Sequence, residues 1–86
     1  MENLKGKKAL ITGGARGLGK ATAIALAKEG VSVAVTGRNE DNLKKTVEEL
    51  KTLGVDATYQ VFDVANYEDV KAGVAQIFAD FARWIS

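Results

Sequence analysis

Apolar and polar residues follow one another along the chain in two kinds of pattern, which predict alternating strands and helices. The apolar run 7–13 is bounded by Lys and Gly and predicts a short buried strand that ends at Thr12. The β-branched run 31–37 predicts a second strand that is covered on both faces. Residues 56–64 predict a third strand. A longer segment with a different period follows each of these runs.

The first two of the longer segments are expected to be helices. Residues 17–29 are rich in alanine and leucine, and Gly30 follows as a stop signal. The residues at helical spacing in this segment are Leu18, Ala21, Ile24, Ala25 and Lys28. Residues 38–54 predict an amphipathic helix that ends at Gly54. Its apolar positions are Leu43, Val47, Leu50 and Leu53.

Residues 66–81 predict a third helix, with Asn66 as its N-cap. Its apolar stripe consists of Val70, Val74, Ile77, Phe78 and Phe81. Trp84 and Ile85 extend this stripe, because Phe81 and Trp84 are three residues apart. Strands that alternate with helices of this length predict a parallel sheet, since parallel neighbours need a crossover that a helix supplies.

The composition narrows the class of protein. A chain of 86 residues forms at most one small domain, which we place at residues 1–86 with an atypical tail at 82–86. The formal net charge of +1 favours neither nucleic acid nor an acidic membrane as a partner. The absence of Cys and His excludes disulfides, imidazole catalysis and the usual zinc sites. No run approaches the roughly 18 apolar residues of a membrane span, so we expect a cytoplasmic protein.

The stretch TGGARGLG, residues 12–19, lies between the first predicted strand and the first predicted helix. Backbone N–H groups and the positive end of the helix dipole meet there, which suits a phosphate. Glycines at 13, 17 and 19 permit a tight turn, close approach of a ligand and close packing of helix on strand, as a dinucleotide site requires. No Gly-Lys-Ser/Thr ends the loop, so it is not a Walker loop. A tight turn that binds nothing is the alternative.

The pattern Thr12-Gly13-x-x-x-Gly17-x-Gly19 resembles the nucleotide-binding motif of the short-chain dehydrogenase/reductase family. TGGARGLG is similar to its ketoreductase branch, which includes the β-ketoacyl-acyl-carrier-protein reductases. GKKALITGGARGLGKATAIALAKEG, VAVTGRNEDNL and FDVAN follow the family's order and spacing, so the resemblance covers residues 5 to about 81. It implies a nicotinamide cofactor and a Rossmann-type three-layer α/β/α fold, here β-α-β-α-β-α with parallel strand order 3-2-1.

The end of the second predicted strand favours NADP over NAD. An NAD site usually has an acid there to accept hydrogen bonds from the ribose 2′-hydroxyl, whereas this chain has Gly37-Arg38-Asn39. The guanidinium groups of Arg38 and Arg16 suit a 2′-phosphate. The alternative is that Arg38 only solvates a turn.

The family resemblance implies further cofactor contacts. Asp63 and Val64, which close the third predicted strand, resemble a pair that contacts the adenine through a carboxylate and a backbone amide. The complete set of expected cofactor-binding residues is Gly13, Arg16, Gly17, Leu18, Gly19, Arg38, Asn39, Asp63 and Val64.

The catalytic groups of the family are not expected in this chain. A reductase of this kind uses a serine and a tyrosine four residues before a lysine. Tyr67 and Lys71 have that spacing, but they open the helix after the third strand and follow no suitable serine, so we interpret them as a coincidental surface pair. We expect the cofactor-binding part of an NADP-dependent ketoreductase, inactive alone. Two alternatives stay open, a nucleotide-binding module and an inert product of a truncation or frameshift.

The first predicted strand is expected to have an open edge. In a doubly wound sheet a fourth strand pairs with that edge, and the resemblance ends before such a strand. Unpaired N–H and C=O groups along an apolar edge favour self-association. We also expect the third helix to cover the face near this edge, with its apolar stripe only partly buried.

Overall fold

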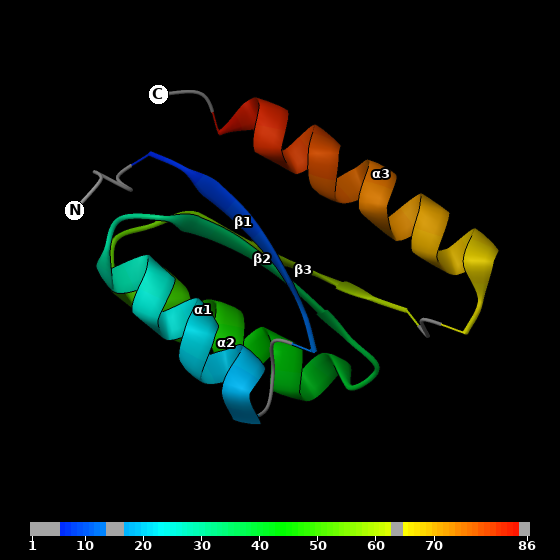
Figure 1. Ribbon diagram of the computed structural model, residues 1–86, viewed down its shortest axis with the longest axis horizontal. Coiled ribbons are helices and arrows are strands. Elements are labelled where there is room, and N and C mark those ends of the chain that lie inside the picture. Colours follow the sequence, from blue (N-terminus) through cyan, green and yellow to red (C-terminus); the bar gives the residue numbers. More distant parts are fainter. Residues whose placement is uncertain (1–5, 14–16, 63–64, 85–86) are drawn as a thin grey trace.

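A computed structural model describes residues 6–13, 17–62 and 65–84, and its course is drawn in Figure 1. Strands and helices alternate in the expected order. Their bounds are β1 Lys8–Thr12, α1 Gly17–Lys28, β2 Ser32–Gly37, α2 Glu40–Thr52, β3 Ala57–Val61 and α3 Tyr67–Arg83.

The described strands form one parallel sheet in which β2 is central. Its order is β1-β2-β3, which confirms the order predicted from the sequence. Thr12 of β1 lies in register with Thr36 of β2, and Gly37 of β2 with Val61 of β3. Because all strands run the same way, their carboxyl ends meet at one edge of the sheet.

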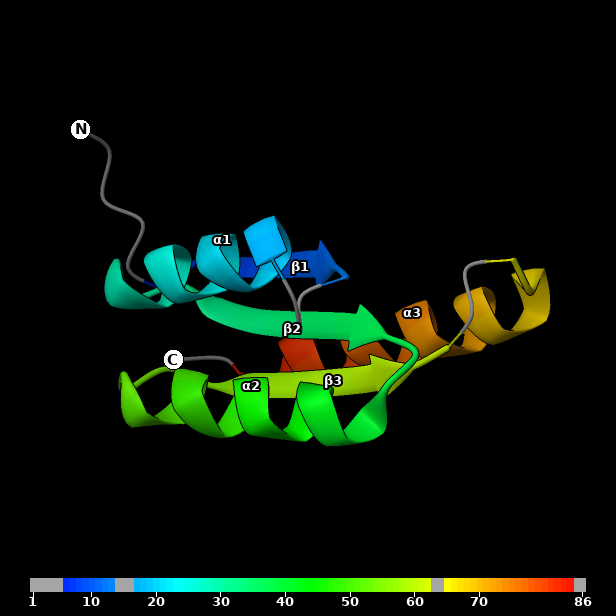
Figure 2. The same cartoon turned by 90° about the horizontal axis from the view of Figure 1, so that it is seen from below.

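Helices cover the two faces of the sheet unequally. Figure 2 shows α1 and α2 together on one face and α3 on the other, which confirms the three-layer architecture. The main core lies between the sheet and the α1–α2 layer. Its buried residues are Ala23, Ala27, Val31, Val33, Val35, Leu43, Val47, Leu50 and Ala57.

The central strand is buried as predicted, and the edge strand is not. Residues Val33 to Thr36 of β2 are all buried. In β1, Ala9 and Ile11 pack against the core, whereas Lys8, Leu10 and Thr12 are exposed, so the expectation of a buried first strand was wrong. The exposed residues alternate with the packed ones, so they lie on the face opposite the main core, where α3 packs mainly against β3.

Helix α1 forms where it was predicted but uses a different face. Ala23 and Ala27 are its buried residues, whereas Leu18, Ala21 and Ala25 are exposed. Small alanines allow the helix to lie close to the sheet, and an alanine-rich helix has little contrast between its faces. The periodicity therefore indicated the helix without identifying its inner side.

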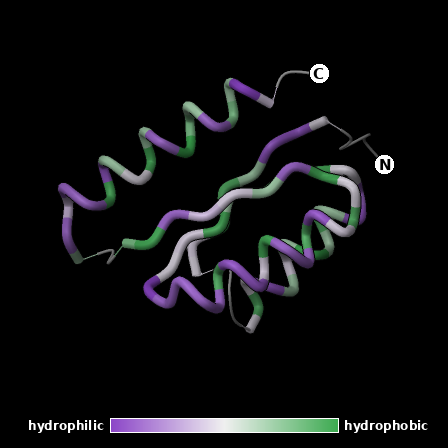
Figure 3. Tube along the Cα trace, turned by 180° about the vertical axis from the view of Figure 1, so that it is seen from behind, coloured by the Kyte–Doolittle hydropathy of each residue, from purple (hydrophilic) through white to green (hydrophobic). Residues whose placement is uncertain are grey.

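Helix α2 follows its sequence pattern closely. Leu43, Val47 and Leu50 are buried as expected, while Leu53 caps the C-terminus and is partly exposed. Figure 3 shows hydrophobic and hydrophilic residues alternating along this helix and along α3. The strong separation of apolar and charged residues explains why the inner face of α2 could be predicted.

Helix α3 begins with the predicted cap. The Asn66 Oδ1 accepts a hydrogen bond from the Asp69 N–H at 3.2 Å. At the other end the rings of Phe81 and Trp84 lie 5.5 Å apart, so Trp84 extends the aromatic row as predicted, whereas Ile85 lies outside the described residues.

The position of α3 differs from expectation, and its inner face differs from the predicted stripe at Phe78. The helix makes its principal contacts with β3 and not near the free edge of β1. Gly73, Ile77 and Asp80 are its buried residues, whereas Phe78 of the predicted stripe is 63% exposed. Val70, Val74 and Phe81 are half-buried, as expected for a stripe that is only partly covered.

Gly73 explains how α3 approaches the sheet. A Cβ atom at this position would lie 2.4 Å from the ring of Phe62, which follows β3. A residue without a side chain is thus required where the helix crosses this ring. Counting apolar residues cannot identify such a contact, because glycine contributes nothing to a hydrophobic pattern. Asp80, one turn beyond Ile77, is buried with hydrogen bonds from Gln76 and Arg83.

We predict that Gly73→Ala destabilises the chain by about 1–2 kcal/mol, because overpacking against Phe62 outweighs the higher helix propensity of alanine. In a Phe62→Val background the ring atoms nearest to the new methyl group are gone. There Gly73→Ala should stabilise by roughly 0.5–1 kcal/mol through helix propensity. Urea unfolding followed by circular dichroism measures the free energy of unfolding of the unmodified chain, the two single variants and the double variant. An equal effect of Gly73→Ala with Phe62 and with Val at position 62 would contradict the contact.

Candidate functional site

The carboxyl edge of the sheet brings the loops after the strands together. The Gly13 N–H, just after β1, donates a hydrogen bond to the Thr36 carbonyl of β2 at 2.8 Å. The Phe62 N–H, just after β3, donates to the Gly37 carbonyl at 3.0 Å. These bonds extend the sheet by one step and fix the start of each loop. The segments that begin at Gly13, Arg38 and Phe62 therefore start side by side.

Two glycines give the loop after β1 its course. Gly13 and Gly17 have φ angles of +66° and +55°, in the left-handed region that side chains rarely adopt. Apart from the adjoining residues and the backbone of α1 itself, no heavy atom of the described chain lies within 4 Å of the Cβ position at either residue. The backbone conformation, and not internal crowding, requires glycine here, and the space beside the backbone is open. Arg16 lies outside the described residues.

The start of α1 suits an anion. Its first turn carries no acidic residue, whereas α2 and α3 begin with acids. The partial positive charge of the helix N-terminus is therefore not offset by a carboxylate in its own first turn. Leu18 lies 84% exposed beside the loop, and Gly19 is half-buried. An exposed leucine next to open glycine backbone supplies an apolar surface for a ligand.

Arg38 follows β2 directly and is exposed. Among the described residues none forms a hydrogen bond or ion pair with its side chain. A cation next to a helix N-terminus is slightly unfavourable for the helix, so local structure gains nothing from this arginine. Its guanidinium is available to an external anion.

Asn39 has a structural role that the sequence did not reveal. Its Oδ1 accepts a hydrogen bond from the Asn42 N–H at 3.1 Å, which makes it the N-cap of α2. The cap fixes where the helix starts and therefore where Arg38 emerges from the sheet. The sequence predicts a cofactor contact from Asn39, and the cap leaves its amide NH₂ group available for one.

A contact between β3 and α2 lies next to Arg38. The Tyr59 hydroxyl donates a hydrogen bond to the Glu40 Oε2 at 3.1 Å. Partial burial raises the pKa of the Tyr59 phenol above its usual value of 10.0, and the hydrogen bond to Glu40 adds to this rise. Sequence reasoning missed the pair because its members are 19 residues apart.

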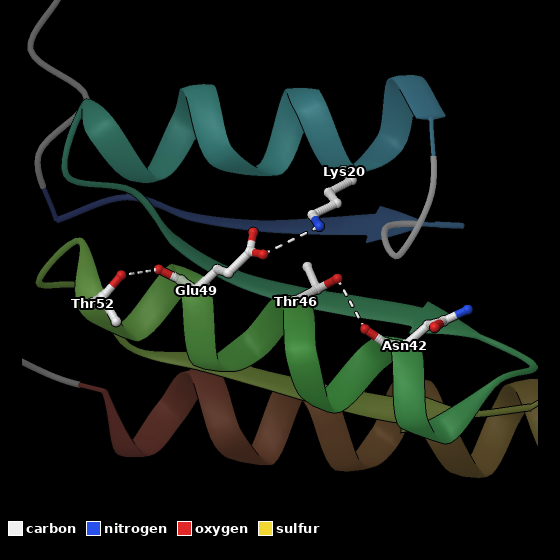
Figure 4. Close-up of polar contacts among 5 residues, drawn as sticks. All are labelled: Lys20, Asn42, Thr46, Glu49 and Thr52. Carbon is white, nitrogen blue, oxygen red and sulfur yellow. Dashed lines mark hydrogen bonds and ion pairs between the residues drawn. The ribbon is translucent and has the colours of Figure 1, made fainter.

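One polar contact joins α1 to α2, and others lie within α2 (Figure 4). The Lys20 ammonium lies 3.3 Å from the Glu49 carboxylate across the two helices. Within α2, the Thr46 hydroxyl donates to the Asn42 carbonyl at 3.0 Å and the Thr52 hydroxyl to the Glu49 carbonyl at 2.6 Å. An exposed ion pair contributes at most about 1 kcal/mol, so this contact adds little to the stability of the fold.

The other residues singled out in the sequence are the expected adenine contacts and the Tyr-x-x-x-Lys pair. Asp63 and Val64, the adenine contacts, lie outside the described residues. Tyr67 and Lys71 are both exposed on the first turns of α3. Within residues 6–13, 17–62 and 65–84 there is no group of acids that could hold a metal ion, and no helix there is long and apolar enough to cross a membrane.

Comparison with known proteins identifies the family. Residues 7–84 match the short chain dehydrogenase family. The chain belongs to the short chain dehydrogenases. The matched region contains the three strands and three helices of the described structure, together with the glycine loop and the segment around Arg38.

Several curated proteins with different names are similar to the chain over most of its length. An uncharacterized oxidoreductase, YvaG of Bacillus subtilis (strain 168), is 44% identical over 77% of this chain and 26% of its own length. Glucose 1-dehydrogenase of Gluconobacter oxydans (strain 621H) is 41% identical over 87% of this chain and 29% of its own length. The 3-oxoacyl-[acyl-carrier-protein] reductase FabG of Staphylococcus aureus (strain Mu50 / ATCC 700699) is 38% identical over 87% and 31%. The chain thus spans less than a third of these relatives.

Solved structures of the family have the same fold. NAD+-bound xylitol dehydrogenase superposes with a TM-score of 0.90 at 34% identity, over 94% of this chain and 31% of that one. An alcohol dehydrogenase from the archaeon Thermococcus sibiricus, complexed with 5-hydroxy-NADP, has a TM-score of 0.84 at 38% identity, over 87% and 32%. Both kinds of dinucleotide therefore occur among the structural relatives of this short chain dehydrogenase.

Proposed function

We propose that residues 1–86 are the NADP-binding part of a ketoreductase of the short chain dehydrogenase family. The observation that carries the proposal is Arg38, an exposed cation at the carboxyl end of the central strand that has no partner among the residues the structure describes. The relatives with NAD or NADP in their structures support a dinucleotide. The choice of NADP rests on the charge at the end of β2.

Charge discriminates between the two cofactors. An acid at the end of β2 would accept hydrogen bonds from a ribose 2′-hydroxyl and would repel a 2′-phosphate. Here that place is taken by Gly37 and Arg38, and the guanidinium can form charge-assisted, bidentate bonds with the phosphate. Arg16, in the glycine loop, adds a second cation in this proposal.

The glycine loop and the start of α1 are proposed to bind the pyrophosphate. Gly13 and Gly17 let the backbone turn with open space beside it, and the N-terminus of α1 contributes N–H groups and a positive dipole end. In this proposal Leu18 packs against the cofactor, Gly19 lets α1 approach β1, and Asn39 both caps α2 and borders the ribose. Asp63 and Val64 contact the adenine.

The chain's own residues then bind and orient the cofactor, and the cofactor supplies the hydride. We propose a keto group on an acyl carrier protein or a similar small carbonyl as the substrate of the enzyme, in line with the FabG relative. We further propose that the 86 residues alone bind the cofactor without turnover, since Tyr67 and Lys71 lie on the exposed start of α3. The proposed location is the cytoplasm.

The cofactor assignment predicts a selective loss on replacing Arg38. Arg38→Ala should weaken NADPH binding about tenfold to a hundredfold, because it removes charge-assisted bonds to the 2′-phosphate, and should change NADH binding by less than about twofold. Titration calorimetry with both cofactors measures the two affinities. Lys51→Ala, which removes the same charge from the far end of α2, should leave both affinities nearly unchanged. Equal affinity of the unmodified chain for NADPH and NADH would contradict the proposal.

A second proposal concerns the open edge of β1. Within the described part of the chain β1 pairs with β2 alone, and Leu10 is 37% exposed on the side of the sheet away from the core. Pairing of two β1 strands would extend the sheet. We propose that the isolated 86-residue chain self-associates through this edge.

This association should depend on protein concentration and on the side chain at Leu10 of β1. Sedimentation velocity should show a mass that rises with concentration, and Leu10→Lys should shift the protein toward monomer because a charge on this strand discourages pairing. Leu53→Lys, at a similarly exposed leucine on the α2 cap, is the matched control and should change nothing. A monomer at every concentration, with a sharp reversible thermal transition, would refute self-association.

A further inference from the structure

Arg38 and Glu40 carry opposite charges on either side of one residue. Between them, Asn39 has an extended backbone with φ −107° and ψ 104°. In extended backbone, residues two apart point to the same side, so the guanidinium and the carboxylate leave the chain in similar directions. Such a pair would be expected to form an ion pair at the surface. The structure shows none, although both side chains are exposed.

The carboxylate of Glu40 is instead bound from another element. The Tyr59 hydroxyl, on β3, donates to its Oε2 at 3.1 Å. Tyr59 is half-buried and packs against the main core, so its ring has a fixed position. The hydrogen bond draws Glu40 toward β3. Asp41 and Lys44 are the other charged groups that act on the Tyr59 phenol.

An ion pair between Glu40 and Arg38 would compete with any anion at Arg38. The carboxylate would offset the positive charge of the guanidinium and occupy some of its N–H donors, and it would repel a phosphate. The hydroxyl of Tyr59 removes this competition by giving Glu40 a different partner.

We propose that Tyr59 is a positioning residue for cofactor specificity: its hydroxyl holds the Glu40 carboxylate against β3 and so keeps the Arg38 guanidinium free for a 2′-phosphate. This inference rests on the proposed function, in which Arg38 binds that phosphate. With Tyr59, the groups that select NADP include a residue on β3, outside the glycine loop and the end of β2.

The test compares two small probes that differ by the 2′-phosphate, 2′,5′-ADP and 5′-AMP. Calorimetry gives their affinities, and the ratio of the two reports on the 2′-phosphate alone. A loss of folded protein lowers both affinities equally, so a merely structural defect leaves the ratio unchanged. The unmodified chain should prefer 2′,5′-ADP.

Tyr59→Phe should lower this preference about two- to fivefold, the range expected for one exposed ion pair. Adding Glu40→Gln to Tyr59→Phe should restore it, because the freed side chain no longer carries a charge. Adding Asp41→Asn instead removes an equal charge from the same helical turn and should not restore it, because the Asp41 side chain has no hydrogen bond with Tyr59. Glu40→Asp keeps the charge but shortens the reach to Tyr59, and should lower the preference without disturbing the packing of the Tyr59 ring.

The outcomes separate the two proposals. An unmodified chain without preference for 2′,5′-ADP overturns the assignment of Arg38, and the role of Tyr59 with it. A clear preference that Tyr59→Phe and Glu40→Asp both leave unchanged overturns the role of Tyr59 alone. Restoration by Asp41→Asn as complete as by Glu40→Gln would also overturn it, since the effect would then be one of net charge.

Discussion

Parallel pairing of β2 with both of its neighbours determines where every candidate binding group lies. Thr12, Thr36 and Gln60 are in register, so the segments that follow the three strands leave the sheet at one edge. The hydrogen bonds of Gly13 to Thr36 and of Phe62 to Gly37 carry this alignment into the loops. The glycine loop and Arg38 are neighbours only because of this alignment.

The sequence predicted the elements and their order better than it predicted their faces. Leu43, Val47 and Leu50 identified the inner side of α2, because charged residues separate them along the helix. In α1 the buried residues are alanines, so hydropathy held little information about its inner face. In α3 the apolar stripe predicted the burial of Ile77, but it wrongly included Phe78 and gave no sign of Gly73 or Asp80. The exposure of β1 could not be inferred from an apolar run either, because it depends on where α3 packs on the far face of the sheet.

The candidate site divides in a similar way. Gly13, Gly17 and Arg38 could be found from the sequence, since loop glycines and a charge at a strand end are local features. In the structure the two glycines have open space at the Cβ position, and Arg38 is exposed. The pairing of Tyr59 with Glu40 depends on how β3 lies against α2 and has no local signal. Specificity for one dinucleotide would then depend on both kinds of feature, a local cation and a distant hydroxyl that keeps it free.

The central claim is that the carboxyl edge of this sheet binds a dinucleotide, and NMR tests it most directly. With backbone amides assigned, NADP+ is added and the shift of each resonance is followed. The account predicts saturable shifts concentrated at Gly13, Gly17 and Arg38, with little change along α3. Shifts absent from these three residues, in a chain whose spectrum shows it to be folded, would contradict the claim.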